Sequence, residues 1–148
     1  MRWGLLVTAV GLLACREPAP IPIVWGEDVC EHCHMTITDP RFAAELLTRT
    51  GKVLRFDDIG CLAEFTLGDR VAEDQVHSRW VMDYLHPEEF LSVQDAIFLH
   101  SDSLRTPMNH GLLAVRAGPA ADSLGTALGG RLMTWPEVLR LIAAGSRS

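Results

Sequence analysis

The feature that most constrains this chain is a six-residue stretch near its start, Cys30-Glu31-His32-Cys33-His34-Met35. It contains two thiols, two imidazoles and one thioether, and no other window of the sequence has a comparable density of metal-binding side chains. The Cys-x-x-Cys pair alone leaves three roles open: half of a zinc site, a redox dithiol, or a soft-metal site. Its spacing lets one loop present both sulfurs to a single ion, so the fold has to support that loop.

Met35 favours the soft-metal site over the zinc and redox roles. Zinc sites use cysteine, histidine and carboxylate ligands but not thioethers, and a redox dithiol does not require a nearby methionine. Thiolate and thioether sulfurs are soft donors, which select Cu(I). We therefore predict a Cu(I) site with Cys30, Cys33 and Met35 as ligands, and with His32 and His34 as possible additional ligands.

A remote methionine, Met108, is the fourth predicted ligand. It lies in the polar, turn-forming segment 106–111, whereas Met82 and Met133 lie within apolar strand-like runs and are assigned to the core. His110 in the same segment is a further possible metal ligand. The predicted ligands therefore come from two loops that are far apart in the sequence.

The composition excludes one large class of partners. The 148 residues are 48% hydrophobic and 22% charged, which is typical of one ordinary globular domain. The formal net charge is −6, and no run of lysine and arginine is present to neutralise phosphates. We therefore expect no nucleic-acid partner.

The start of the chain predicts export and a membrane anchor. A basic residue followed by a short apolar run is typical of a secretory signal peptide, here residues 1–14. The sequence Leu12-Leu13-Ala14-Cys15 resembles the bacterial lipobox, in which the cysteine is lipidated and becomes the first mature residue. We expect a proline-rich tether over 15–23 and a metal-binding domain over 24–148. The mature protein would lie in the bacterial cell envelope, facing the periplasm or the outer surface.

Hydrophobic periodicity predicts an α+β domain. After an expected strand start at Met35, strands are predicted at 41–48, 52–56, 80–84, 96–99, 112–116 and 131–135. A polar connector is predicted at 69–78, and a turn or single helical turn at 87–91. Helices are predicted at 58–67, capped by Asp57, at 120–128, and from Pro136 onward. Val24 and Trp25 are expected to pack beneath the cysteine stretch.

Two segments of the chain match each other by residue class. Gly51-Lys-Val-Leu-Arg-Phe-Asp-Asp-Ile corresponds to Gly130-Arg-Leu-Met-Thr-Trp-Pro-Glu-Val. The match predicts an internal duplication of two similar strand–strand–helix halves, at about 24–75 and 79–148. In that arrangement Met35 and Met108 occupy equivalent positions and face each other.

The chain resembles the NosL-type copper chaperones, accessory lipoproteins of nitrous oxide reductase maturation. The matching blocks are Cys30-x-x-Cys33-x-Met35-Thr-Ile-x-Asp39 with Arg41-Phe42-Ala43-Ala44-Glu45, Phe56-Asp57-Asp58-Ile59-Gly60-Cys61-Leu62, and Pro107-Met108-x-x-Gly111. The chain departs from the family at His34, where glycine is usual, and at Asn109-His110, where small residues are common.

The resemblance implies a function and a fold. The family binds one Cu(I) through sulfur and passes it to the apparatus that builds the copper centres of nitrous oxide reductase, so the implied partners are a membrane transporter complex and the apo-reductase. The implied fold has two similar α+β halves with an organomercurial-lyase-like topology.

Two other functions stay open. An exported thiol oxidoreductase or an organomercurial-lyase-like enzyme could use Cys30 and Cys33, and a structural zinc module could use the same pair. Met35 and Met108 favour the copper carrier, and the absence of a second paired Cys/His set disfavours zinc. No catalytic triad and no phosphate-binding glycine pattern is recognisable, so we predict a non-enzyme in which Cys61 is a buried, inert thiol.

Overall fold

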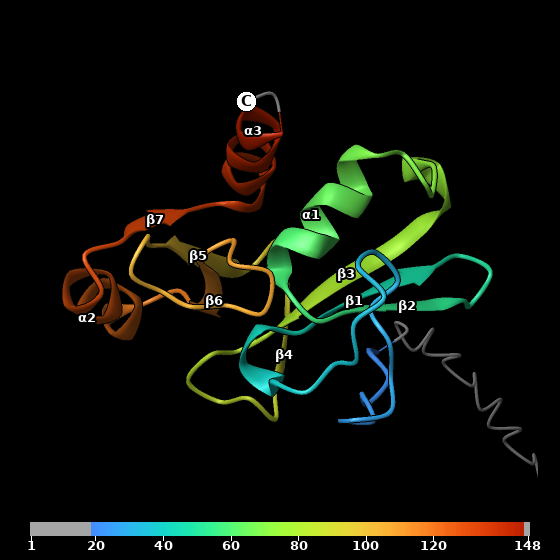
Figure 1. The fold of residues 1–148 in the computed structure, drawn as a ribbon, viewed down its shortest axis with the longest axis horizontal. Helices are drawn as coiled ribbons and strands as arrows, with labels where there is room; N and C mark the ends of the chain where they lie inside the picture. Colours follow the sequence, from blue (N-terminus) through green and yellow to red (C-terminus); the bar gives the residue numbers. More distant parts are fainter. Residues whose placement is uncertain (1–18, 147–148) are drawn as a thin grey trace, which may run out of the picture.

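The computed structural model describes residues 19–146 (Figure 1), so the predicted signal peptide and Cys15 lie outside the described residues. The elements are η1 (Pro40–Phe42), β1 (Ala44–Thr48), β2 (Val53–Phe56), α1 (Ile59–Leu67), η2 (Glu73–Gln75), β3 (Val76–Met82), β4 (Phe90–Ser92), β5 (Ala96–His100), β6 (Leu112–Arg116), α2 (Pro119–Ala127), β7 (Arg131–Met133) and α3 (Trp135–Gly145). Within the described range, no helix has the length and apolar character needed to cross a bilayer.

The strands form two antiparallel sheets. One has the order β2-β1-β3-β4, and the other has the order β6-β5-β7. Figure 1 shows α1 over one face of the four-stranded sheet and next to α3, while α2 lies against the three-stranded sheet. The predicted α+β class is confirmed.

One continuous core joins the two sheets. Leu54 and Phe56 from β2 belong to the same buried cluster as Phe98 from β5 and Met133 from β7. The ring of Phe98 packs against that of Trp135 at the start of α3, with 5.5 Å between centroids. Because the apolar faces of both sheets and of α1 and α3 bury one another, the halves share their stabilising contacts.

Helix α1 begins one residue later than expected. Its N-cap is Asp58, whose carboxylate accepts a hydrogen bond from the Gly60 N–H at 2.7 Å, and it ends at the C-cap Gly68. The predicted cap, Asp57, is therefore not needed to satisfy the helix N-terminus. Its carboxylate is available for another contact, which is described below.

Several expected strands differ from the structure. The segment after Met35 forms only an isolated bridge between Val29 and Thr36. The strand predicted at 80–84 begins earlier, at Val76, because pairing with β1 extends it into polar sequence, and the turn predicted at 87–91 contains the start of β4. Val24 and Trp25 are exposed rather than packed beneath the cysteines.

The strand predicted at 131–135 ends at Met133, because a capping box starts α3 at that point. Thr134 is the N-cap, and its N–H and hydroxyl both donate to the Glu137 carboxylate, at 2.8 and 2.9 Å. Trp135 is therefore the first residue of a helix rather than the last residue of a strand.

The connectivity differs from the predicted strand–strand–helix repeat. β6 and β7 do not pair, because β5 lies between them. Instead, each sheet has a central strand, β1 or β5, flanked by the next strand in the chain and by the strand that follows a helix. Met35 precedes β1 whereas Met108 precedes β6, so this connectivity does not make the two methionines equivalent. The four-stranded sheet ends with β4 at Ser92, and the three-stranded sheet begins with β5 at Ala96.

Candidate metal centre

Four potential ligand atoms converge beneath the cysteine loop. The Sγ atoms of Cys30, Cys33 and Cys61 and a carboxylate oxygen of Asp57 all lie within 4.8 Å of one another. All three cysteines are free thiols. We call these four residues the cysteine cluster, and its atoms are close enough together to hold one metal ion.

The backbone of the cysteine loop is folded by local hydrogen bonds. The Cys30 N–H donates to the Met35 carbonyl at 2.8 Å, and the His34 N–H donates to the Cys30 carbonyl at 3.0 Å. The Glu31 N–H donates to the Arg55 carbonyl at 2.8 Å and so attaches the loop to β2. These bonds turn both cysteine side chains toward the start of α1.

His34 adopts a backbone conformation that favours glycine. Its φ is +63°, in the left-handed region that non-glycine residues adopt at a cost of about 1–2 kcal/mol. A glycine, as the resemblance to the NosL-type chaperones leads one to expect at this position, would adopt the same turn without that cost. This chain places an exposed histidine there.

Helix α1 supplies the other half of the cluster. Cys61 lies in the first turn of the helix, Asp57 directly precedes the N-cap Asp58, and both residues are buried. The Cys33 Sγ donates a hydrogen bond to the Asp57 Oδ1 at 3.3 Å. The shift of the N-cap to Asp58 thus leaves Asp57 free to bind the cysteine loop.

The three thiols have different proton affinities. The pKa of Cys30 is lowered to about 6, chiefly because the Cys61 thiol donates a hydrogen bond to it, and the backbone N–H groups of Cys33 and Asp57 add to this effect against the opposing effect of burial. Burial raises the pKa of Cys33 to about 12, and the Cys30 and Asp57 side chains reinforce that shift. The pKa of Cys61 is raised because its proton is held by Cys30. At neutral pH the metal-free cluster therefore has one thiolate and two thiols.

Both predicted thioether ligands lie at the surface. The exposed fraction is 58% for Met35 and 41% for Met108, whereas Met82 and Met133 are buried, as predicted. The Met108 N–H donates to the Asp58 Oδ2 at 3.1 Å. This bond brings the Met108 loop to the N-terminus of α1, next to the cluster residue Asp57.

Carboxylates bind two of the three candidate imidazoles. The His32 Nε2 lies 2.8 Å from the Glu64 Oε2, and the His110 Nδ1 lies 3.0 Å from the Asp58 Oδ1. The side chain of His34 is exposed. None of the three imidazoles is part of the cysteine cluster.

Sequence reasoning did not assign Cys61 and Asp57 to the site. The predicted burial of Cys61 in a helix is right, but its sulfur faces the other two cysteines rather than an inert core. The available signal was a third cysteine in the first turn of a predicted helix, next to an acidic pair, in a chain whose other two cysteines of the predicted domain form the Cys-x-x-Cys motif.

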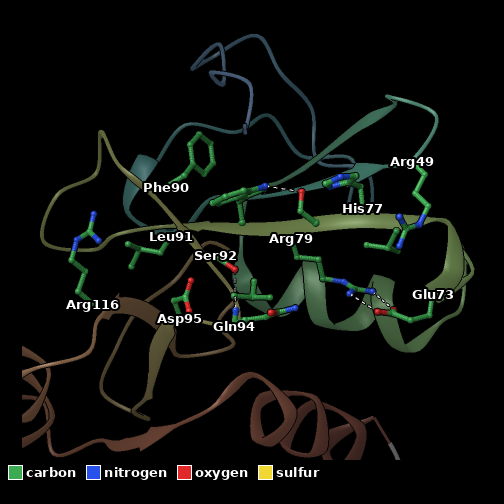
Figure 2. Close-up of a pocket in the computed structure, with 14 residues that line it drawn as sticks. Arg49, Glu73, His77, Arg79, Phe90, Leu91, Ser92, Gln94, Asp95 and Arg116 are labelled. Atoms are coloured by element: carbon green, nitrogen blue, oxygen red, sulfur yellow. Dashed lines mark hydrogen bonds and ion pairs between the residues drawn. The ribbon is translucent and has the colours of Figure 1, made fainter. Parts of the chain in front are cut away.

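A separate groove of about 680 Å³ runs along β3 and β4 (Figure 2). Its lining includes Arg49, Arg79 and Arg116 but none of the four cluster residues. Among the described residues, no thiol ligand for a soft metal ion lines this groove. We therefore assign the candidate metal centre to the cysteine cluster and not to this groove.

Comparisons with known proteins agree with this fold. A structure of the copper chaperone NosL from Shewanella denitrificans superimposes with a TM-score of 0.71 at 24% sequence identity, covering 81% of this chain and 96% of that chain. A sequence comparison with curated proteins gave no match. The model of the NosL family matches residues 21–142, which is most of the chain. This protein is therefore a member of the NosL family.

Proposed function

We propose that this protein is a carrier of Cu(I). The observation that supports this proposal most directly is the convergence of three cysteine sulfurs within 4.8 Å. Soft sulfur donors select Cu(I), and the Shewanella protein with the same fold is a copper chaperone. In this proposal Cys30 and Cys33 bind the ion as thiolates, and Met35 and Met108 contribute thioethers from the exposed side.

The protonation of the cluster suits a site that must release its ion. Cys61 stabilises the Cys30 thiolate by donating a hydrogen bond, so we assign it to tuning Cys30 rather than to binding copper. Neutral thioethers add less negative charge than further thiolates would, and they therefore hold Cu(I) less tightly than an all-thiolate site.

We further propose that the copper is destined for nitrous oxide reductase. The recipients would be a membrane transporter complex and the apo-reductase. A lipid anchor at Cys15 would hold the carrier at the membrane, close to these recipients. Family membership and the lipobox sequence support this role. If Cys15 is the anchor, Cys15→Ala releases the protein from membranes; a variant that stays membrane-bound and lipid-labelled would contradict it.

Zinc is the second candidate ion, because Asp57 adds a hard carboxylate to the three sulfurs. Cysteine and carboxylate together form an acceptable tetrahedral zinc site. This alternative predicts a structural role in which metal removal unfolds the domain. The copper carrier, by contrast, stays folded without its ion.

An anaerobic titration against a competing chelator separates the two ions. We expect one Cu(I) per chain and a preference for Cu(I) over Zn(II). Cys30→Ser and Cys33→Ser should each weaken Cu(I) binding beyond the roughly 100-fold loss that changes outside the ligand shell cause. Cys61→Ser, which keeps a hydrogen-bond donor, is the matched control and should cost less. No bound copper, or a preference for Zn(II), would overturn the proposal.

A further inference from the structure

A chain of polar contacts links the cysteine loop to the Met108 loop. The His32 Nε2 lies 2.8 Å from the Glu64 Oε2, and the His110 Nε2 lies 3.5 Å from the Glu64 Oε1. The other ring nitrogen of His110 lies 3.0 Å from the Asp58 Oδ1. Glu64 is therefore the residue at which the two loops meet.

The inner end of this network is buried at the start of α1. Asp58 is fully buried, and its carboxylate accepts hydrogen bonds from the Gly60 N–H and from the Met108 N–H. A Cβ atom on Gly60 would lie 2.1 Å from the His110 Cγ, so the imidazole rests directly on the helix backbone. The Met108 loop is thus packed against α1 as well as hydrogen-bonded to it.

The outer end of the network holds the cysteine loop. His32 lies between Cys30 and Cys33 in sequence, and its Nδ1 is buried and has no hydrogen-bond partner. The contact from its Nε2 to Glu64 is therefore the one polar contact that the structure records for this ring. The Glu64 carboxylate therefore holds the His32 ring and adds a side-chain contact to the backbone hydrogen bonds that fold the cysteine loop.

One helix therefore supports both parts of the proposed site. Residues four apart on a helix share a face. Gly60 and Glu64 form such a pair on α1 and contact the two histidines, while Cys61 in the same helical turn and Asp57 just before the N-cap belong to the cysteine cluster. The cysteine cluster and the Met108 loop are consequently both positioned by α1.

We propose that Glu64 is a positioning residue for the metal centre. By holding His32 and His110 on its two carboxylate oxygens, it sets the distance between the cysteine thiolates and the Met108 thioether. This inference rests on the proposed function, because it assumes that Met108 binds the ion. Groups that orient ligands from outside the ligand shell typically change metal affinity by about 10–100-fold.

A double-mutant cycle between Glu64 and Met108 tests the inference. Glu64→Ala should weaken Cu(I) binding about tenfold, and Met108→Ala should weaken it by a similar factor. The double variant should be no weaker than the single variants, because without Glu64 the thioether no longer reaches the ion. X-ray absorption should show one sulfur fewer around copper in Glu64→Ala, as in Met108→Ala. Glu73→Ala, which removes a carboxylate paired with Arg79 away from the site, is the control and should change neither measurement.

Several outcomes would overturn the inference. Multiplicative effects in the double variant, an unchanged sulfur count in Glu64→Ala, or no effect of Met108→Ala would each do so. If Glu64→Ala fails to fold, His32→Ala replaces it, because it breaks only the outer contact and leaves the bonds of Asp58 to His110 in place. Failure of the proposed function is a separate result, seen as absence of Cu(I) binding by the unaltered chain.

Discussion

At the scale of single residues, Cys30 and Cys33 lie in one loop but differ in protonation. The Cys30 sulfur accepts hydrogen bonds from the Cys61 thiol and from backbone N–H groups, whereas the Cys33 thiol donates its proton to the Asp57 carboxylate. In the proposed carrier, copper binding by both sulfurs would therefore release a proton mainly from Cys33. This difference gives the metal-free protein a measurable pH dependence.

We expect the stability of the metal-free protein to rise between pH 6 and pH 9. The pKa of Cys30 is lowered from 9.0 to about 6, so its contribution is fully present above pH 9 and is lost as the pH falls through 6. Cys33 and Cys61 have raised pKa values, so they lose protons first in the unfolded chain, and they begin to oppose this trend only as the pH approaches 9. Chemical denaturation at a series of pH values measures it.

Substitutions at Cys30 and Cys61 test whether the Cys61 thiol lowers the pKa of Cys30. Cys30→Ser should remove both the pH-dependent stability and the thiolate ultraviolet absorbance that titrates near pH 6. Cys61→Ala should move that titration upward, because the main hydrogen-bond donor to Cys30 is lost, whereas Cys61→Ser should keep it low. An unchanged titration in Cys61→Ala would show that Cys61 does not stabilise the thiolate.

At the scale of elements, α1 contacts both the cysteine loop and the Met108 loop. Its closest contact with the Met108 loop is at Gly60, where the His110 ring packs against the helix backbone. Gly60→Ala places a Cβ atom 2.1 Å from the His110 ring, which Asp58 and Glu64 hold in place. We expect a loss of about 1–3 kcal/mol in the free energy of unfolding, typical of overpacking.

Gly145→Ala in α3 is the control for this substitution. A Cβ atom at Gly145 meets nothing within 4 Å, so this change should be neutral or should stabilise by up to about 1 kcal/mol through helix propensity. Thermal or denaturant unfolding compares the two variants. Equal effects at the two glycines would mean that the His110 ring is free to move aside.

The elements that sequence reasoning predicts well are those built from local signals. The β1–β2 hairpin follows from the turn at Gly51, and α1 follows from an acidic cap and a closing glycine. The start of β3 and the whole of β4 depend on pairing between distant segments, which a polar stretch such as 76–79 does not reveal.

The same limit applies to the candidate site. Cys30 and Cys33 are recognisable because both lie in one loop, while Cys61 joins them only when α1 packs beneath that loop. The role of Asp57 depends on which of two adjacent aspartates caps the helix, and the sequence does not distinguish them.

At the scale of the whole molecule, one core joins the two sheets, so we expect them to unfold together. Met133 in β7 belongs to the buried cluster that also contains Leu54 and Phe56 of the other sheet. Met133→Ala should lower the free energy of unfolding by at least about 2 kcal/mol, as other core truncations do, without changing Cu(I) affinity of the folded protein.

Circular dichroism and tryptophan fluorescence should report one coincident transition for this variant. Met108→Ala, at an exposed position, should stay within about 0.5 kcal/mol of the parent while weakening Cu(I) binding. Separate transitions for the two signals, or a stability loss in Met108→Ala as large as in Met133→Ala, would contradict this assignment.

If the protein carries Cu(I) as proposed, the unequal exposure of the cluster sulfurs gives copper transfer a direction. Cys30 and Cys61 are sealed from solvent, while Cys33 is only partly buried. A ligand from an acceptor protein would therefore approach an ion in this cluster from the side of Cys33. The bond between the ion and the Cys30 sulfur would be the last to break. Handover should then proceed by associative exchange, with a rate that grows with acceptor concentration and no free copper ion released on the way.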